Sequence, residues 1–535
     1  MANLFKNVID RMVWVQTSPT PNAHSAGTSM CHDMRNDISR NPFIYNLVAT
    51  TILNRFNIVT KAWQLAVNPG VSAVAASSNS CYVPSFSVVG TIAAGATTSR
   101  FTLSTALPAP IGVNMLANRG GSGERGYIIR ITDTTVGKTE ERFIVSNTGG
   151  TTPVISVDVP FTFTPTTGAR YEILSGRVIM LGSGAPVAAS WRSFEVATNF
   201  VTNLSNTNLP TIATESALLV LDEQYVPFNH IPGEGMVKGS FVYDTNITAR
   251  RSLAATATAA GTLTGQASNG DSLVVANEYR NFQIRIVQDT VTPGAVGQRR
   301  IIASHTAGPN PVYTLGTNWS VTPSSSAKYV IELPNLIILR TSANTTTYTY
   351  NYTDATINNG TNNITANTWS TTYFGVGPAV NGVGNLWCPS FGIQPDVDKN
   401  TRHSFNYFFR GNSAALDLLD ISGAITGSWS GNITYDGSTN TFSAGTTGVY
   451  APYGQEGRYS YINIYVNGAI NQTFRFDSKN RVLSPYAVPD FIQSGTAASG
   501  GRMASYVAID GTDKYDVILL ESHLSTITQE LIVLV

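Results

Sequence analysis

Three carboxylates near the middle of the chain are of the type that hydrolytic chemistry uses. Asp222 and Glu223 are adjacent, and Glu234 follows them closely. Glycoside hydrolases place two carboxyl groups about 5 to 9 Å apart across the sugar, a distance that a sequence does not supply. Neighbouring carboxylates in a chain with 33 acidic residues usually lie in a solvated turn or cap. We therefore expect these three to be non-catalytic, with a glycoside hydrolase as the minor alternative.

One short motif carries metal-binding side chains. Cys31-His32-Asp33 follows His24, and thiolate and imidazole are ligands of zinc. Adjacent residues of an extended strand, however, point to opposite faces, so Cys31 and His32 would not converge. The three cysteines, Cys31, Cys81 and Cys388, are far apart and form no CxxC pair. We expect ordinary loop residues here and no metal site.

A glycine-rich segment matches a nucleotide-binding pattern. Residues 121–126 read Gly-Ser-Gly-Glu-Arg-Gly, a GxGxxG sequence. That motif presents amide groups to a pyrophosphate only between a strand and a helix N-terminus. Here a strand pattern, 127–131, follows instead, which predicts a loop without nucleotide. The remaining histidines are isolated in sequence and are expected to be satisfied locally: His230, His305, His403 and His523.

Aromatic side chains suggest a third chemistry, stacking on sugar rings. They cluster at 348–352, at Tyr373-Phe374 and at Trp387. Exposed at one end of a fold, they would indicate an adhesin. Packed between sheets, they would belong to the core, and this second interpretation is favoured in a chain with 10% aromatic residues.

The elements that position these residues are nearly all strands. Short alternating apolar and polar runs, bounded by Gly, Asn, Pro and Ser, fill most of the chain, as at 459–465. A helical period occurs at the start, where Leu4, Phe5, Val8, Ile9 and Met12 recur at three-to-four spacing. A second short helix is expected at 216–222.

An internal duplication links two segments of about 80 residues. Arg142 corresponds to Arg300 and Tyr171 to Tyr329, at a constant offset of 158 residues. A constant offset preserves strand register, because a slip of one residue would turn every side chain to the other face. We expect two homologous β-modules with one topology. Outside them, aromatic landmarks recur about every 40 to 60 residues, which is the length of a β-propeller blade.

Composition limits the partners. The chain has 535 residues, zero formal net charge and only 12% charged residues, about half the usual share. A protein that neutralised many phosphates or lay on an anionic membrane would need a basic surplus. No run of 18 apolar residues occurs, and the N-terminus lacks a secretion signal. A neutral hydroxyl and amide surface favours association, so we expect the chain to lie within an assembly.

The chain resembles a family of virion proteins. The stretch 405–438, with Phe474-Arg475-Phe476-Asp477 and the closing 516–520, is similar to the degenerate kelch-like propellers of tailed-bacteriophage structural proteins. The duplicated modules, with Ile-Arg-Ile and Gly-Gln-Arg-Arg-Ile-Ile, are similar to insertions in the same proteins, which include tail nozzle and neck components. The resemblance implies a virion building block without a fixed catalytic set. It covers the chain from about residue 54 onward.

These observations predict an all-β protein. The expected fold is an irregular kelch-like β-propeller of six or seven blades with two inserted homologous β-modules and a short N-terminal helical or extended segment. The expected divisions are 1–95 (N-terminal arm and first propeller part), 96–176 (module 1), 177–250 (propeller), 251–334 (module 2) and 335–535 (C-terminal blades).

The resemblance implies a non-enzymatic structural component of a phage tail, nozzle or neck, assembled in the host cytoplasm as a homo-oligomeric ring. Its expected partners are other virion proteins of the tail, neck or portal vertex. We expect no catalytic, cofactor-binding or metal-binding residues, no cofactor, no sequence-specific nucleic-acid binding and no membrane insertion. A receptor- or glycan-binding adhesin and a capsid decoration protein are the alternatives.

Overall fold

The computed structural model describes most of the chain between residues 43 and 378, together with a series of strands on either side. The described ranges are 14–16, 21–22, 29–33, 43–75, 78–85, 87–117, 126–212, 215–224, 230–231, 235–236, 253–266, 275–342, 344–378, 382–389, 405–411, 413–433, 446–451, 459–466, 470–478, 480–485, 502–510, 513–521 and 528–533.

Within these ranges the propeller consists of six four-stranded antiparallel sheets, or blades. Blade 1 contains β2 (Ser29–Cys31), β3 (Phe43–Ala49), β4 (Ile52–Asn57) and β5 (Ala62–Val67). Blade 2 contains β6 (Asn79–Val83), β13 (Arg177–Leu181), β14 (Trp191–Glu195) and β15 (Phe200–Asn203). Blade 3 contains β16 (Ser216–Leu221), β26 (Leu336–Thr341), β27 (Tyr348–Asn351) and β30 (Thr368–Ser370).

The other three blades follow in chain order. Blade 4 contains β31 (Gly382–Pro389), β32 (Phe405–Gly411), β33 (Leu416–Asp420) and β34 (Ser428–Ile433). Blade 5 contains β35 (Thr447–Ala451), β36 (Tyr459–Val466), β37 (Ile470–Asp477) and β38 (Val482–Pro485). Blade 6 contains β39 (Arg502–Asp510), β40 (Asp513–Glu521), β41 (Thr528–Val533) and β1 (Trp14–Gln16).

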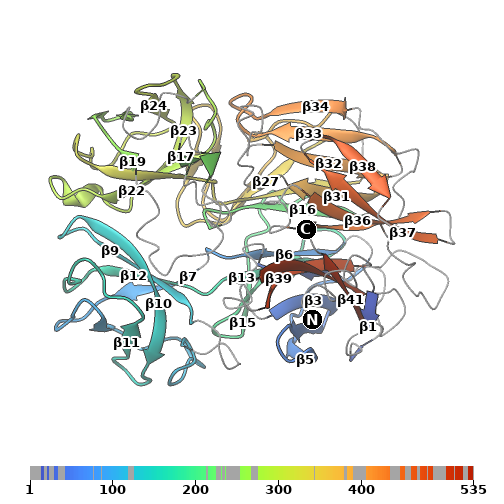
Figure 1. Ribbon diagram of the computed structural model, residues 1–535, viewed down its shortest axis with the longest axis horizontal. Coiled ribbons are helices and arrows are strands. Elements are labelled where there is room, and N and C mark those ends of the chain that lie inside the picture. Colours follow the sequence, from blue (N-terminus) through green and yellow to red (C-terminus); the bar gives the residue numbers. More distant parts are fainter. Residues whose placement is uncertain are drawn as a thin grey trace.

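The blades close into a ring. One edge strand of each blade, in the order β2, β6, β16, β31, β35 and β39, contacts the corresponding strand of the next blade, and β39 contacts β2 again. Blade 6 is completed from both ends of the chain, because Trp14 pairs with Leu531 of β41. Figure 1 shows β1, β41 and β39 together beside β3 and β5 of blade 1. The expected irregular propeller is confirmed, with six blades.

One expected helix is wrong. Residues Ser216–Leu221 form β16, which pairs with β26 over its full length. Its apolar run is buried on both faces of an inner strand, and such a run cannot be told from a buried helix by periodicity. The N-terminal segment 1–13 lies outside the described residues. Only one helix, the short 3-10 turn η4 (Pro293–Ala295), occurs among the described residues, and none there could span a membrane.

Aromatic side chains fill the spaces between blades. The ring of Trp191 in blade 2 lies 5.3 Å from Tyr350 and 4.9 Å from Trp369 in blade 3, measured between ring centroids. Between blades 3 and 4, the buried guanidinium of Arg340 lies 4.9 Å from the rings of both Phe408 and Trp429. These contacts join neighbouring sheets through rigid side chains.

Both modules are inserted at equivalent places, after the inner strand of a blade. Module 1 lies between β6 and β13 of blade 2, and module 2 lies between β16 and β26 of blade 3. Figure 1 shows the two modules side by side, away from blades 5 and 6. Both belong to one 13-stranded sheet, which is continuous through the pair Lys138 and Gln288.

The modules have the same strand order. Module 1 comprises β7 (Ser87–Thr91), β8 (Arg100–Thr102), β9 (Ile128–Asp133), β10 (Lys138–Asn147), β11 (Val154–Val157) and β12 (Arg170–Leu174), paired in the order β7-β12-β9-β10-β11-β8. Module 2 comprises β19 (Leu253–Ala254), β20 (Ala257–Ala259), β21 (Thr262–Thr264), β22 (Gln283–Gln288), β23 (Arg299–His305), β24 (Val312–Leu315) and β25 (Lys328–Glu332), paired as β19-β25-β22-β23-β24-β21-β20. Module 1 thus begins at Ser87, before the expected residue 96.

Two hairpins complete the described strands: β17 (His230–Ile231) with β18 (Gly235–Met236), and β28 (Ile357–Asn358) with β29 (Asn363–Ile364).

The corresponding residues Arg142 and Arg300 make equivalent contacts. Arg142 pairs with Ile129 across the ladder, and Arg300 pairs with Ile284. Each guanidinium donates to the carbonyl of the preceding residue and to a carbonyl of the connection after the next strand. Each also lies over an aromatic ring of that connection, at 5.0 Å for Phe161 and 5.4 Å for Trp319. The duplication therefore extends from register to side-chain contacts.

A third equivalent pair, Asn147 and His305, differs in that only one member titrates. Asn147 Oδ1 accepts the backbone N–H of Leu116, and His305 Nε2 accepts that of Tyr279 at 2.9 Å. With Nε2 accepting, Nδ1 carries the proton and donates to the Thr306 carbonyl. Protonation would place a second N–H against the Tyr279 amide. Burial above all, and then the charge of Arg280, lower the pKa of His305 to about 4.

We expect acid to destabilise the wild-type protein through His305. Between pH 6.5 and 4 the unfolded state binds a proton that the folded state excludes, so this contribution is complete above pH 6.5 and is lost as the pH falls to about 4. A shift of this size corresponds to about 3 kcal/mol. His305→Asn, which copies the module 1 residue, should fold and lose this slope. The measurement is urea unfolding of both proteins from pH 4 to 7.

The difference between the two proteins isolates His305 from other titrations. Asp222, whose pKa is raised to about 6, contributes a slope of opposite sign between about pH 4 and 6, but it does so in both proteins. Parallel stability curves for wild type and His305→Asn over this range would refute the assignment.

Candidate functional site

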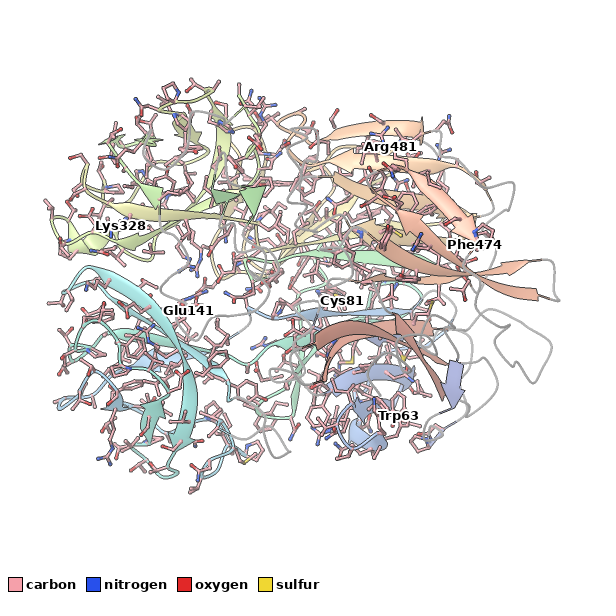
Figure 2. The ribbon with its side chains drawn as sticks, in the orientation of Figure 1. Trp63, Cys81, Glu141, Lys328, Phe474 and Arg481 are labelled. Atoms are coloured by element: carbon pink, nitrogen blue, oxygen red, sulfur yellow. The ribbon has the colours of Figure 1, made fainter. Side chains whose placement is uncertain are left out.

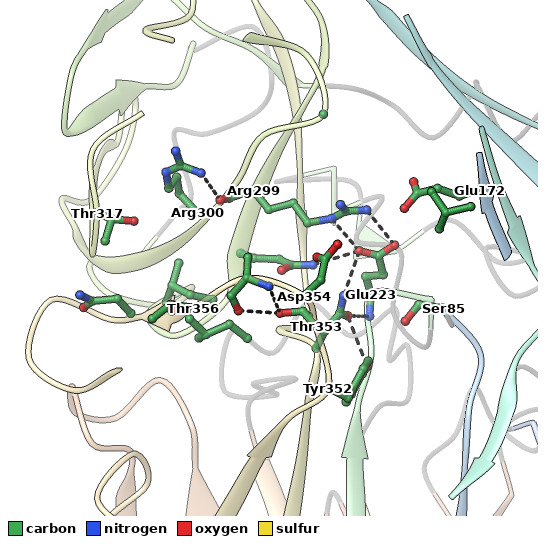
Figure 3. A pocket seen from close by; sticks show the side chains of 18 of the residues that line it. Ser85, Glu172, Glu223, Arg299, Arg300, Thr317, Tyr352, Thr353, Asp354 and Thr356 are labelled. Carbon is green, nitrogen blue, oxygen red and sulfur yellow. Dashed lines mark hydrogen bonds and ion pairs between the residues drawn. The ribbon is translucent and has the colours of Figure 1, made fainter. Parts of the chain in front are cut away.

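Among the described residues, the largest concentration of buried charge lies where the two modules meet the propeller. Ser85 follows β6 of blade 2, and Asp222 and Glu223 follow β16 of blade 3, so both lie at the points where the modules are inserted. Arg130 comes from β9 of module 1 and Arg299 from β23 of module 2. Figure 3 shows Glu223 between these bodies, with Arg299 directed toward its carboxylate.

Glu223 is the centre of this junction. Its carboxylate accepts Arg130 Nη1 at 2.7 Å and Arg299 Nε at 3.0 Å, while its side chain is 1% exposed. The side-chain amides of Gln283 and Asn335 donate to the same carboxylate at 3.3 Å each. One carboxylate therefore binds module 1, module 2 and blade 3 together.

The ion pairs continue between the modules. Arg130 also pairs with Glu141 at 2.7 Å and with Glu172 at 3.5 Å, both within module 1. Glu141 lies 4.0 Å from Arg285 of module 2, which pairs in turn with the buried Glu332. Figure 2 shows Glu141 on β10 at the side of module 1 that faces module 2. We call these residues the junction network: Arg130, Glu141, Glu172, Glu223, Arg285, Arg299 and Glu332.

Charge pairing dominates the titration of Glu223 and Arg299. Burial disfavours the charge on Glu223, but Arg130, Arg299 and Arg285 outweigh this effect and hold the pKa of Glu223 well below its usual range. Burial likewise disfavours the charge on Arg299, and Glu223 reverses it, so the pKa of Arg299 is raised. Glu223 is thus ionised at neutral pH. It cannot donate a proton as a general acid at neutral pH.

Asp222 is buried beside Glu223 but is bound differently. Its Oδ2 accepts the hydroxyls of Ser85 and Tyr352 at 2.7 Å each, and its Oδ1 accepts the backbone N–H of Gln224. Burial, followed by repulsion from Glu223, raises the pKa of Asp222 to about 6. Its contacts connect the end of blade 2 to blade 3 through hydrogen bonds.

The expectation of a solvated turn at Asp222 and Glu223 is wrong, because both are fully buried. Glu223 is paired with Arg130 and Arg299, which lie at least 76 residues away in sequence, so no local pattern indicated its burial. Glu234 lies outside the described residues. The arginines of the network were also missed as functional residues. The only available signal was the Ile-Arg-Ile motif, which places Arg130 and Arg285 at corresponding positions of the two modules.

The other candidates have structural explanations where they are described. Cys31 ends β2 and lies in a buried apolar cluster, and burial raises the pKa of its thiol to about 12. His32 and Asp33 follow β2 outside any strand, and both are buried. No metal-binding group of three His, Cys, Asp or Glu occurs among the described residues. His24, His403 and His523 lie outside those residues, and the side chain of His230 does too.

Most of the glycine-rich segment lies outside the described residues, and only Gly126 belongs to them. A Cβ there would collide with the Ile144 carbonyl, so close backbone approach accounts for this glycine. The aromatic candidates are confirmed as core: Tyr350, Tyr373 and Phe374 are 0% exposed and Trp387 is 7% exposed.

Comparisons with known proteins identify no family for this chain. No family model matches it, and no curated protein matches it. Among solved structures, a protein of unknown function from Bacteroides thetaiotaomicron is similar at 9% identity and TM-score 0.21, covering 84% of this chain and 98% of that one. The tricorn protease (9%, TM-score 0.16, 95% and 43%) and the NanB sialidase of Streptococcus pneumoniae (10%, TM-score 0.22, 96% and 84%) are also similar. All three scores are too low to carry an argument about function.

Proposed function

We propose that this protein is a non-enzymatic structural component of a tailed-bacteriophage virion, forming part of the tail, nozzle or neck as a homo-oligomeric ring. The observation that carries the proposal is the junction network, which joins the two modules and the propeller through buried charges. Breaking such pairs leaves uncompensated buried charge. The two modules and the propeller should therefore move together as one stiff body, which is suited to transmitting force between neighbouring subunits.

The chemistry of the junction also favours a structural role over hydrolysis. Glu223 is held ionised by two arginines. The carboxylate oxygens of the neighbouring Asp222 accept hydrogen bonds from Ser85, Tyr352 and Gln224. Neither carboxylate is left to attack or protonate a substrate. The resemblance of 405–438 and the modules to phage virion proteins supplies the setting: assembly in the host cytoplasm with other tail, neck or portal-vertex proteins, and no cofactor.

The low-charge surface supports homo-oligomerisation, because little charge has to be desolvated on association. β1 is the outermost strand of blade 6, and the segment 1–13 precedes it in the sequence. That segment carries the apolar stripe Leu4, Phe5, Val8, Ile9 and Met12. A stripe so short needs a packing surface, since an isolated helix of this length is unstable. We assign it to contact with a neighbouring copy.

Deleting residues 1–13 should leave the propeller folded but reduce both ring formation and incorporation into particles. The measurements are native mass spectrometry of the purified chain and quantitative immunoblotting of virions. The paired substitution Leu4→Ser with Val8→Ser should reproduce the loss, and Asn3→Ser with Asn7→Ser on the polar face is the matched control. Incorporation of the truncated chain at the normal level, or isolated monomers on the shell, would exclude the ring and favour a decoration role.

A further inference from the structure

A cavity of about 350 Å³ adjoins the junction network, of which Arg130, Glu172, Glu223 and Arg299 line it. Module 1 contributes Val89, Arg170 and Glu172 to its walls, and module 2 contributes Arg299 and Thr317. Residues 352–358, which follow β27 in blade 3, form a third wall. Figure 3 shows Asp354 and Thr353 on this loop, opposite Arg299 and Glu172. The volume is at the lower end of the range, roughly 300 to 1,000 Å³, of small-ligand sites.

The cavity is lined by four arginines and three carboxylates: Arg130, Arg170, Arg299, Arg300, Glu172, Glu223 and Asp354. When Arg285, Glu141 and Glu332 of the adjoining junction network are added, the count is five charges of each sign. Arg299 is paired with Glu223, and Arg170 lies 3.2 Å from Glu172. An ionic ligand would have to compete with these internal partners or remain without a counter-charge, and both are costly in a partly buried site. The cavity therefore favours a ligand without net charge.

Hydrogen-bonding capacity nevertheless remains at the mouth. The carboxylate of Asp354 is exposed and has no hydrogen-bond partner among the described residues. Arg170, with 49% of its side chain exposed, donates to Glu172 alone among those residues. Arg299, 31% exposed, uses Nε and Nη2 on Glu223 and leaves Nη1 available. Acceptors on one wall thus face donors on the others.

We propose that this cavity is a binding site for an uncharged saccharide. Every sugar hydroxyl is both donor and acceptor, and adjacent hydroxyl pairs match the planar, two-pronged geometry of guanidinium and carboxylate groups. Apolar contact for a sugar face comes from Val89, which is 46% exposed, and from Ala355. A ligand held here would touch both modules and blade 3 at once. The proposal does not depend on ring formation.

Saturation-transfer NMR and calorimetry on the full chain test this site. The neutral probes are methyl glycosides of glucose, galactose and N-acetylglucosamine, with lactose and chitobiose, followed by an array of bacterial cell-surface glycans. Asp354→Ala and Arg170→Ala should each weaken binding at least tenfold. Neither side chain is buried, so both variants should fold. Arg100→Ala is the matched control, because Arg100 is an exposed arginine of module 1 that does not line the cavity.

Saturable binding of a neutral saccharide that both cavity variants weaken and the control leaves unchanged would support the proposal. Absence of binding across the probes and the array would overturn it. So would binding that neither cavity variant changes, or binding of glucuronate or glucose 6-phosphate in place of the neutral sugars. Native mass spectrometry without saccharide measures the ring separately, so failure of this site and failure of the proposed function are distinguishable.

Discussion

Glu223→Gln should lower the free energy of unfolding by about 3–5 kcal/mol, the cost of leaving a buried charge without its partner. The amide keeps the volume of the side chain but removes the negative charge that Arg130 and Arg299 share. Both arginines stay protonated without it, since a guanidinium is not deprotonated in proteins at neutral pH. The loss of stability should be greatest at the junction between the modules and the propeller. Hydrogen exchange should therefore become faster in β9 and β23 before it changes in blades 5 and 6.

Asp354→Asn is the matched control, because it makes the same chemical change on the rim of the same cavity. Asp354 is exposed and has no ion-pair partner among the described residues, so its substitution should change stability by less than about 0.5 kcal/mol. Calorimetry and hydrogen exchange should be read together, since a chain of several packed bodies need not unfold in two states. A Glu223→Gln protein as stable as the control would show that the network contributes little.

Gly137→Ala should separate the two modules. Gly137 has a φ of +76°, and its carbonyl accepts the backbone N–H of Asp289 at 2.9 Å across the module boundary. A Cβ at this position would collide with the Asp289 carbonyl oxygen, which belongs to the backbone and cannot turn aside. We expect a loss of about 2–5 kcal/mol, from the left-handed conformation and the overlap together.

Gly150→Ala distinguishes the collision from the backbone conformation. Gly150 has a φ of +92° and lies in the same module, but a Cβ there would meet no atom within 4 Å. It should therefore cost only the conformational part, about 1–2 kcal/mol. Limited proteolysis should cut the Gly137→Ala protein at the boundary where the two modules touch, near Gly137 and Asp289, and leave the Gly150→Ala protein intact. Equal stability and equal cutting of the two variants would contradict the role assigned to the boundary.

The propeller and the equivalence of the two modules could be predicted because both depend on local patterns. Strand alternation is visible within a few residues, and the constant offset between Arg142 and Arg300 preserves register over several strands. The junction network depends on contacts between distant segments. Glu223 meets Arg130 only because two insertions in neighbouring blades fold against each other. No spacing of residues along the chain predicts the contact between Glu223 and Arg130.

The error at Ser216–Leu221 has a related cause. An inner strand covered on both faces has no alternation, so its composition is that of any buried segment. Once β16 is a strand that ends at Leu221, Asp222 and Glu223 must enter the space between blade and modules. The mistaken helix and the mistaken solvated turn therefore follow from the same missing information, the position of the strand in the sheet.

Closure of blade 6 by β1 and β41 fixes the timing of folding during synthesis. Leu531 is synthesised 517 residues after its partner Trp14. At roughly 5–20 residues per second, the strand Trp14–Gln16 waits about half a minute to two minutes for its place in the sheet. During that time its backbone groups are open to any other strand, including the same strand position of a neighbouring nascent chain. Ribosomes spaced closely on one message would therefore favour exchange of β1 between neighbouring chains, and synthesis of β41 is the step that lets each chain close its own propeller.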